Sequence, residues 1–176
     1  ARLNINLRCG ARVLMELGSF PARDFEALFQ GVYALPWENY IPRDGEFPVK
    51  GYSLNSQLHS VPACQSIVKK ASAKRLGEKY GVETLPESGS RYQIQFSIIK
   101  DVATLYLDTS GEGLYKRGYR AKNMGAPLRE TLAAALVTLS RYRGKDPFCD
   151  PFCGSGTIPI EAALIAKNRA PGLDRS

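Results

Sequence analysis

The segment RYQIQFSIIKDVATLYLD, Arg91 to Asp108, carries the alternation of apolar and polar residues that decides the fold. Residues of one face are apolar or aromatic and those of the other are polar: Tyr92, Ile94, Phe96 and Ile98 against Gln93, Gln95 and Ser97. This is the period-two pattern of a half-buried strand. Lys100 and Asp101 interrupt it, and an apolar-rich run returns from Val102. Two such runs joined by a two-residue break predict an antiparallel hairpin.

Upstream of this hairpin, the apolar spacing predicts five more elements. Alternation predicts strands at 3–9, 13–17 and 47–52, and helical periodicity predicts helices at 22–35 and 60–80. The second helix has clear end signals, because Ser60 and Pro62 favour its start and Gly81 its end. This order of elements predicts an α+β domain with a largely antiparallel sheet over residues 1–110.

Downstream, residues 111–176 are expected to form a linker and the start of a second domain. An amphipathic helix is predicted by Leu128, Leu132, Ala135 or Leu136, and Leu139. DPFCD (146–150) is expected to form a short strand, and Thr157 to Lys167 a helix. A strand, a glycine turn and a helix are the opening of a Rossmann-like α/β domain, and the chain ends soon after it. We therefore expect this chain to be a piece of a longer protein.

The composition is that of a folded globular protein. The 176 residues are 44% hydrophobic and 23% charged, and no run approaches the roughly 18 apolar residues of a membrane span. The start of the chain lacks the layout of a secretory signal, so a cytoplasmic protein with reduced cysteines is expected. A metal site is not expected, because Cys149 and Cys153 have no nearby partner ligands and the single histidine, His59, is distant in sequence. The net charge of +7 favours a polyanionic partner.

The loop DPFCGSGT, Asp150 to Thr157, is the strongest candidate for a binding site. Gly154 and Gly156 permit the positive φ and close approach that a strand-to-helix turn around a ligand requires. The following helix points free N–H groups and the positive end of its dipole at the same place, which suits an anionic or polar cofactor. Pro159 fits a first turn, and the dipole favours the carboxylate of Glu161.

Glycine-rich loops of this kind have three other interpretations. A Walker phosphate loop requires a lysine after the last glycine, but Thr157 follows Gly156 directly. A dinucleotide fingerprint requires a third glycine where Pro159 stands. A tight turn without a ligand remains open on the glycines alone.

The longer string DPFCGSGTIPIEAA resembles the first motif of S-adenosylmethionine-dependent nucleic-acid methyltransferases, in which D-P-F/M-C/A-G-S/T-G-T is highly specific. The chain as a whole resembles the bacterial THUMP-domain RNA methyltransferases. That family includes the rRNA guanine-N2 methyltransferases, and its members are often labelled N6-adenine-specific DNA methylases. The likeness is carried, in this order, by WENYIPRDGEFPVKG, SVPACQSIVKKA, LDTSGEGLYKRGYR, APLRETLAAAL and the motif string.

The resemblance implies a ferredoxin-like and THUMP module that grips structured RNA, rRNA or tRNA, followed by a Rossmann-like catalytic domain. It assigns S-adenosyl-L-methionine to the loop residues Asp150, Cys153, Gly154, Ser155, Gly156 and Thr157. Residues Pro127, Leu128 and Thr131 of the preceding helix are secondary candidates. Relatives commonly have histidine where this chain has Tyr115, so stacking is retained there and imidazole chemistry is lost.

The family's catalytic string, Asn/Asp-Pro-Pro-Phe/Tyr, does not occur in this sequence. The acidic residue expected to hold the ribose is also missing, because no apolar strand leads into Asp174. The catalytic residues are therefore expected beyond Ser176, and the chain alone is expected not to methylate.

Two basic segments are candidate RNA contacts. Lys116, Arg117 and Arg120 are interleaved with Tyr115 and Tyr119, which combines phosphate-pairing charges with rings for stacking. Lys69, Lys70, Lys74 and Arg75 lie on the second predicted helix. The alternatives are a solvated linker and a solvated helix face. Trp37, Phe47, Tyr92 and Phe96 are expected in the core.

Three other functions remain open: an RNA-binding module without catalysis, a DNA adenine-N6 methyltransferase, and a tRNA-thiolating enzyme. The last is disfavoured because no nucleotide loop for that chemistry is present.

Overall fold

The computed structural model describes residues 1–120 and 128–175, which form two compact units. One unit is Leu14–Gly111, and the other joins Ala1–Val13 to Glu112–Ser176. The division at Gly111 lies beside the expected boundary at residue 110. Residues 1–13, however, group with the C-terminal segment and not with the sheet.

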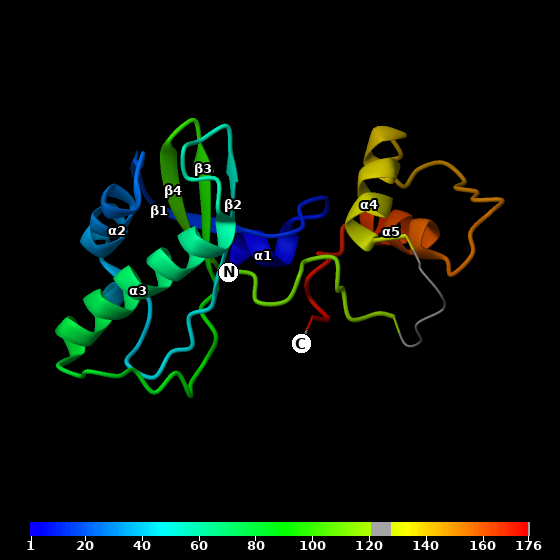
Figure 1. Cartoon of the computed structure of the whole chain (residues 1–176). Coiled ribbons are helices and arrows are strands. Elements are labelled where there is room, and N and C mark those ends of the chain that lie inside the picture. The colour runs from blue at the N-terminus through cyan, green and yellow to red at the C-terminus, as the bar shows by residue number, and fades with distance from the viewer. Residues whose placement is uncertain (121–127, 176) are drawn as a thin grey trace. The chain divides into compact units, whose positions relative to one another are not determined.

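The unit Leu14–Gly111 is a four-stranded sheet with two helices (Figure 1). Along the chain it contains β1 (Leu14–Pro21), α2 (Phe25–Ala34), a 3-10 turn η1 (Trp37–Asn39), β2 (Val49–Leu54), α3 (Val61–Tyr80), β3 (Ile94–Ile99) and β4 (Val102–Asp108). The strand order is β1-β4-β3-β2. The pairs β1–β4 and β4–β3 are antiparallel, and β2–β3 is parallel. The parallel pair is a consequence of α3, because a long helical crossover returns the chain in the same direction.

The hairpin predicted from the opening segment is present. β3 and β4 pair from Ile94 opposite Leu107 to Ile99 opposite Val102. Lys100 and Asp101, with φ of 50° and 63°, form the two-residue connection. Positive φ at both positions is the geometry that follows the right-handed twist of the two strands. At the outer edge, Leu14 at the start of β1 stands opposite Asp108 at the end of β4.

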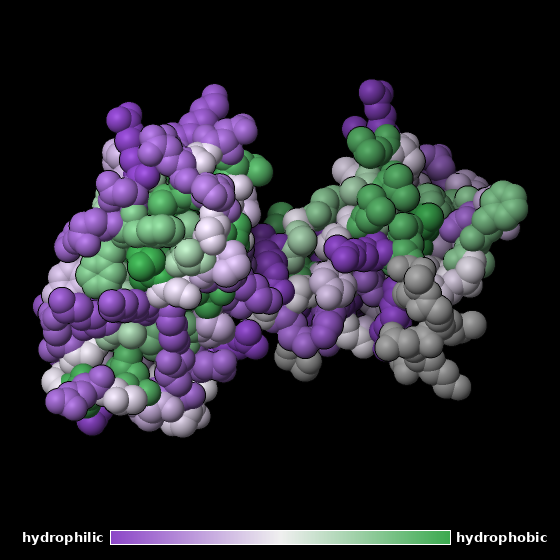
Figure 2. All heavy atoms as spheres, viewed as in Figure 1, coloured by the Kyte–Doolittle hydropathy of each residue, from purple (hydrophilic) through white to green (hydrophobic). Residues whose placement is uncertain are grey.

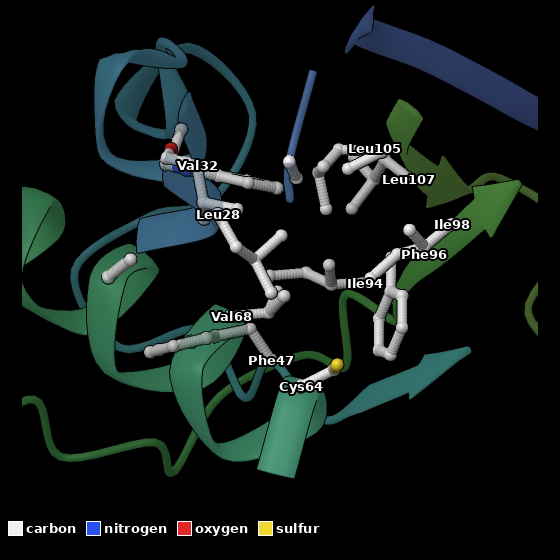
Figure 3. Packing of buried hydrophobic residues seen from close by; sticks show 14 of the residues in the cluster. Leu28, Val32, Phe47, Cys64, Val68, Ile94, Phe96, Ile98, Leu105 and Leu107 are labelled. Carbon is white, nitrogen blue, oxygen red and sulfur yellow. The ribbon is translucent and has the colours of Figure 1, made fainter. Parts of the chain in front are cut away.

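The core of this unit lies between the sheet and the helices α2 and α3 (Figure 3). Leu28 and Val32 of α2, Cys64 and Val68 of α3, and alternate residues of β3 and β4 point into it. Trp37 and Phe47 are fully buried and Phe96 is 1% exposed, so these three expectations are confirmed; Tyr92 is partly buried against the same cluster. Each fully buried large apolar side chain contributes about 1.5–3 kcal/mol through loss of water contact.

The helix ends of this unit follow local chemistry. Asp24 caps α2, because its carboxylate accepts a hydrogen bond from the amide of Ala27 at 2.7 Å. α3 ends at Gly81, whose left-handed φ of 64° is that of a C-terminal glycine cap. Ser60 stands at the N-cap of α3, but its hydroxyl makes no capping hydrogen bond there, contrary to the prediction.

The second unit contains α1 (Arg2–Asn6), α4 (Glu130–Leu139) and α5 (Thr157–Ala166). α4 and α5 pack against each other (Figure 1). The outer side of α4 is apolar, as Figure 2 shows, with Leu132, Leu136 and Leu139 exposed by 50%, 43% and 77%.

Two predicted strands are wrong. Residues 3–9 include a helical turn, in which the amide of Leu7 donates to the carbonyl of Leu3 at 2.9 Å. The apolar pattern of residues 3–9 fits a strand, but it also fits a helix, because Leu3 and Leu7 are four residues apart and so lie on one helical face. Residues 146–150 form no strand: Asp146 lies in a bend, and none of the five pairs with a strand among the described residues.

Among residues 1–120 and 128–175, no helix has the length and apolar character needed to cross a bilayer.

Candidate functional site

The loop from Asp150 to Thr157 makes a tight turn into α5. Gly154 and Gly156 have φ of 52° and 76°, the left-handed region that favours glycine. The amide of Gly156 donates to the carbonyl of Cys153 at 2.8 Å, and the amide of Phe152 donates to the Asp150 carboxylate at 3.1 Å. Gly156 is the N-cap of α5, so the free amides of the first turn lie next to the loop.

A cavity of about 440 Å³ lies over this loop. Its lining is Leu128, Asp150, Phe152, Cys153, Gly154, Ser155, Thr157 and Ile158. It therefore brings together five of the six predicted loop residues and the secondary candidate Leu128. Gly156 does not line it and serves as the helix cap instead. Thr131 is 7% exposed and is not part of the lining, and Pro127 lies outside the described residues.

The glycines leave open space on the ligand side of the loop. A Cβ atom added at Gly154 would have no neighbour nearer than the carbonyl oxygen of Phe152 at 4.0 Å, and one at Gly156 none nearer than Ile160 at 3.9 Å. Because the chain itself does not fill this space, the loop fits a bound group that approaches the backbone closely.

Arg120, which the sequence predicted as an RNA contact, is partly buried and supports the loop. Its guanidinium donates to the carboxylate of Glu130 at 3.0 Å, the first residue of α4, and to the hydroxyl of Thr157 at 3.2 Å, the first residue of α5. The Thr157 hydroxyl also lies 3.2 Å from that of Ser155. One side chain thus ties the N-terminal ends of two helices to the candidate cofactor loop.

Arg117 is also misassigned by the sequence pattern, because it is buried. It is 2% exposed, and its Nε lies 3.5 Å from Oε1 of the fully buried Glu161. The guanidinium also donates to the carbonyl oxygens of Leu7, Arg8 and Leu114. A buried charge with this many partners is a structural element.

Glu161 supports the helix behind the loop in a way that the sequence did not predict. The sequence predicted that the helix dipole would favour it, but it lies in a buried ion pair and accepts a hydrogen bond from the hydroxyl of Tyr119 at 3.1 Å. Burial raises the pKa of Glu161, while Arg117 and the Tyr119 hydrogen bond oppose that rise. The available signal was a single carboxylate inside the otherwise apolar helix TIPIEAALIA.

Lys116 and Tyr115 remain at the surface. The ammonium of Lys116 lies 2.7 Å from the carboxylate of Glu112, one helical turn back in sequence, and both side chains are more than half exposed. This hydrogen bond raises the pKa of Lys116. The guanidinium carbon of Arg129 lies 5.5 Å from the centre of the Tyr115 ring, within cation–π range.

On α3 the four predicted basic contacts divide into two pairs. Lys69 binds Glu87 at 2.6 Å and lies 3.4 Å from the ring centre of Phe47, and Arg75 binds Glu38 at 2.6 Å. These two ion pairs stabilise the unit, and the Lys69 and Arg75 side chains are 35% and 22% exposed. Lys70 and Lys74 are exposed and stay candidates.

No group of three or more His, Cys, Asp or Glu residues in the described parts of the chain is arranged to hold a metal ion.

Comparison with known proteins identifies both parts of the chain. Residues 22–108 match the THUMP domain, and residues 117–176 match the RMKL-like methyltransferase domain. The chain therefore contains a THUMP domain followed by an RMKL-like methyltransferase domain. The resemblance read from the sequence motifs is confirmed, as is the mixed α/β fold class.

Curated relatives of this THUMP-domain chain are longer proteins. It is 49% identical to "Putative RNA methyltransferase YpsC" of Bacillus subtilis, over 99% of this chain and 46% of that protein. It is 37% identical to "Ribosomal RNA large subunit methyltransferase K/L" of Syntrophotalea carbinolica, over 96% of this chain and 24% of that protein. The chain thus spans about half the length of the first relative and about a quarter of the length of the second.

Solved structures share the fold of both parts. A protein of Listeria monocytogenes described as "a predicted N6-adenine-specific DNA methylase" is 53% identical, with a TM-score of 0.94 over 99% of this chain and 46% of that one. A second, "SMU.472, a putative methyltransferase complexed with SAH", is 47% identical, with a TM-score of 0.90 over 98% of this chain and 46% of that one.

Proposed function

We propose that this chain is the RNA-binding and cofactor-loop portion of an S-adenosylmethionine-dependent methyltransferase that modifies the exocyclic N2 amine of a guanine in ribosomal RNA. The observation that carries the proposal is the Asp150–Thr157 loop, which has two left-handed glycines, an open cavity and the start of α5 in one place. The relative complexed with SAH, the demethylated form of the cofactor, supports the cofactor class, and the relative named as a ribosomal RNA methyltransferase supports the substrate class.

The chain's own residues would bind the cofactor by its amino-acid end. The amides at the start of α5 and the positive end of its dipole suit a carboxylate. The carboxylate of Asp150, fixed in the loop by the amide of Phe152, suits an ammonium group. When bound, S-adenosylmethionine supplies a methyl group on a positively charged sulfur. The chain would contribute position, because in-line attack by an amine depends mainly on distance and alignment.

The finer parts of this proposal concern the complete protein. The sequence contains no Asn/Asp-Pro-Pro-Phe/Tyr string, so we expect the 176-residue chain alone not to transfer a methyl group. The target amine needs a platform and an acceptor, and a flipped base is normally held in a closed pocket. An assay of radiolabelled methyl transfer to ribosomal RNA, comparing the 176-residue chain with the full-length protein, tests this point. Transfer by the short chain would contradict it.

The cofactor proposal is tested by calorimetric titration of SAH into the full-length protein and its Gly154→Asp variant. We expect heat of binding for the unchanged protein and none for the variant, because a carboxylate would occupy the cavity. The substitution has room within the chain, since the nearest atom to the added Cβ is 4.0 Å away. Gly81→Asp is the matched control, because Gly81 also has a left-handed φ of 64° and nothing within 4 Å of a Cβ. Equal binding by Gly154→Asp and Gly81→Asp would contradict the proposal.

A DNA adenine-N6 methyltransferase is the second candidate, favoured by the description of the Listeria relative. Competition between structured rRNA and duplex DNA separates these two candidates. Both nucleic acids are compared at one salt concentration, because salt screens their electrostatic attraction to the protein. Preference for duplex DNA would favour the second candidate. SAH binding by the full-length protein separates both from an RNA-binding module without catalysis.

A further inference from the structure

The net positive charge of the chain lies in one of its two units. Residues 1–13 and 112–176 contain fourteen Lys and Arg against six Asp and Glu, a formal charge of +8. Residues 14–111 contain ten against eleven, a formal charge of −1. Attraction of a polyanion is therefore strongest at the unit that carries the Asp150–Thr157 loop, and not at the sheet unit.

That unit has a second cavity, here called the basic pocket, with a volume of about 370 Å³. Ten residues line it, of which five are Lys or Arg and two are Glu. The volume is within the range of pockets that hold small ligands. A formal charge of +3 on the lining favours an anionic ligand of about the size of one nucleotide.

Two of the five cations are held by buried carboxylates, and the other three lie at the pocket wall, where Lys116 pairs with the exposed carboxylate of Glu112 at 2.7 Å. Arg117 and Arg120 are engaged by Glu161 and Glu130, as described above. Lys116 and Arg129 are exposed side chains on the pocket wall. Arg175 donates to the carbonyl oxygen of Glu112 at 2.8 Å, which holds its guanidinium at the same wall.

Arg129 is placed by two features of the chain. Its guanidinium lies over the Tyr115 ring, and a cation over an aromatic face keeps its N–H donors in its own plane, directed sideways. It is also the N-cap residue of α4, so the free amides of that helix start beside it. A guanidinium next to a helix N-terminus is a favourable arrangement for a phosphate.

The basic pocket adjoins the cofactor loop. Leu128 lines both cavities. Arg120, in the wall of the basic pocket, also donates to Thr157 of the loop at 3.2 Å. A ligand in the basic pocket would therefore lie next to the group held by the loop.

We propose that the basic pocket binds one nucleotide of the substrate RNA strand, with its phosphate held by Lys116, Arg129 and Arg175, beside the nucleotide to be methylated. The proposal rests on the proposed function, because it assumes an RNA substrate. It adds a phosphate-binding pocket next to the cofactor loop, so that RNA is fixed on the catalytic unit itself as well as on the THUMP domain. Tyr115 acts in it as a positioning residue for Arg129.

The test compares two charge-matched double variants of the full-length protein. Lys116→Gln with Arg129→Gln changes the pocket, and Arg143→Gln with Lys145→Gln removes two exposed cations of the same unit that do not line it. Binding of a fluorescent ribosomal RNA fragment is measured by anisotropy over a range of salt concentrations. We expect the pocket variant to raise Kd about tenfold or more and to lower the salt slope by up to about 0.7, because both side chains contact the phosphate of one nucleotide in a single strand. The control should change Kd by less than about threefold, because its cations add only to the general attraction.

The positioning role of Tyr115 is tested by a separate pair of variants in the same RNA-binding assay. Tyr115→Phe keeps a ring under Arg129 and should retain RNA affinity, whereas Tyr115→Ala should weaken RNA binding to a similar degree as Arg129→Gln. Equal effects of the Phe and Ala variants would remove Tyr115 from the proposal.

SAH titration of the same variants separates the proposals. If the pocket variant keeps SAH affinity and loses RNA affinity, the basic pocket is an RNA site. Equal loss of RNA affinity in the pocket and control variants, or loss of SAH affinity with RNA binding intact, overturns the inference while the proposed function stands. If the unchanged protein binds neither SAH nor RNA, the proposed function itself fails.

Discussion

Replacing Arg117 by methionine tests whether the buried ion pair with Glu161 holds α5 and the cofactor loop in place. The side chains are 2% and 0% exposed, so Arg117→Met leaves a carboxylate in the interior without its cation. It also leaves the carbonyl oxygens of Leu7, Arg8 and Leu114 without a donor. Removing one partner of a buried pair costs about 3–5 kcal/mol, which corresponds to roughly a thousandfold change in the local opening equilibrium.

Hydrogen exchange of the α5 amides in the full-length protein is the suitable assay, because it reports the opening of this helix separately from the sheet unit. We expect exchange in Arg117→Met to be faster by about two to three orders of magnitude, up to the limit set by global unfolding. Lys167→Met removes an exposed cation at the end of the same helix and should change the free energy of opening by less than about 0.5 kcal/mol.

The loss of α5 stability in Arg117→Met should also depend on pH. Burial raises the pKa of Glu161, and removing the cation raises it further. A carboxyl group with a raised pKa in the folded state takes up a proton more readily there than in the unfolded chain. Its contribution to stability is therefore greatest at low pH and falls as the pH rises from about 4.3 through the folded pKa. The deficit of Arg117→Met should be smaller at pH 5 than at pH 8, after correction for the intrinsic exchange rate.

A double variant distinguishes an unpaired charge from simple loss of packing. Arg117→Met combined with Glu161→Leu removes both charges and should recover about half of the lost stability, since apolar replacement of a whole buried pair is often neutral. Exchange in Arg117→Met within about twofold of the unchanged protein, or a double variant no better than the single one, would refute this account of the pair.

Two further predictions concern other ion pairs. Arg120→Gln removes the link between Glu130 and Thr157, so we expect calorimetry to show SAH bound at least about fivefold more weakly. This is a loss of about 1 kcal/mol, part of the roughly 1.5–3 kcal/mol that a hydrogen bond to a charged group contributes. Arg120→Lys should recover little, because one ammonium cannot span both partners, and full recovery would show that charge alone is required. In the sheet unit, the hydrogen bond from Arg75 lowers the pKa of Glu38, so this pair stabilises the unit above about pH 4.3 and the contribution is lost as pH falls through the folded pKa. Arg75→Gln should lower the unfolding free energy by about 1 kcal/mol at pH 7 and by less at pH 3, measured by urea titration with Trp37 fluorescence, and an equal deficit at both pH values would contradict it.

The sequence predicted the sheet unit well because its signals are local. The alternation at 91–99, the turn at Lys100 and Asp101, and the helix ending at Gly81 are each encoded within a few residues. The segment at 3–9 failed for the opposite reason. Its conformation is set by distant partners, such as the amide of Gly172, which donates to the carbonyl of Ile5 at 2.9 Å.

In the candidate site, too, some features are encoded locally in the sequence and others depend on distant partners. The loop glycines could be found from the sequence, because positive φ beside a helix start leaves few alternatives to glycine. The basic residues could not be sorted, since Lys116 and Arg117 are neighbours in sequence, yet one is exposed and the other is 2% exposed. Only the fold shows that Arg117 forms an ion pair with Glu161 and Arg120 one with Glu130.

The pairing of Leu14 with Asp108 bears on how such proteins can be rebuilt. The chain enters and leaves the sheet unit at adjacent points on neighbouring strands, so a short glycine–serine turn could close the gap if the whole unit were excised. The same two points are a natural junction for transplanting this module into another enzyme, or for exchanging it for one that prefers a different RNA.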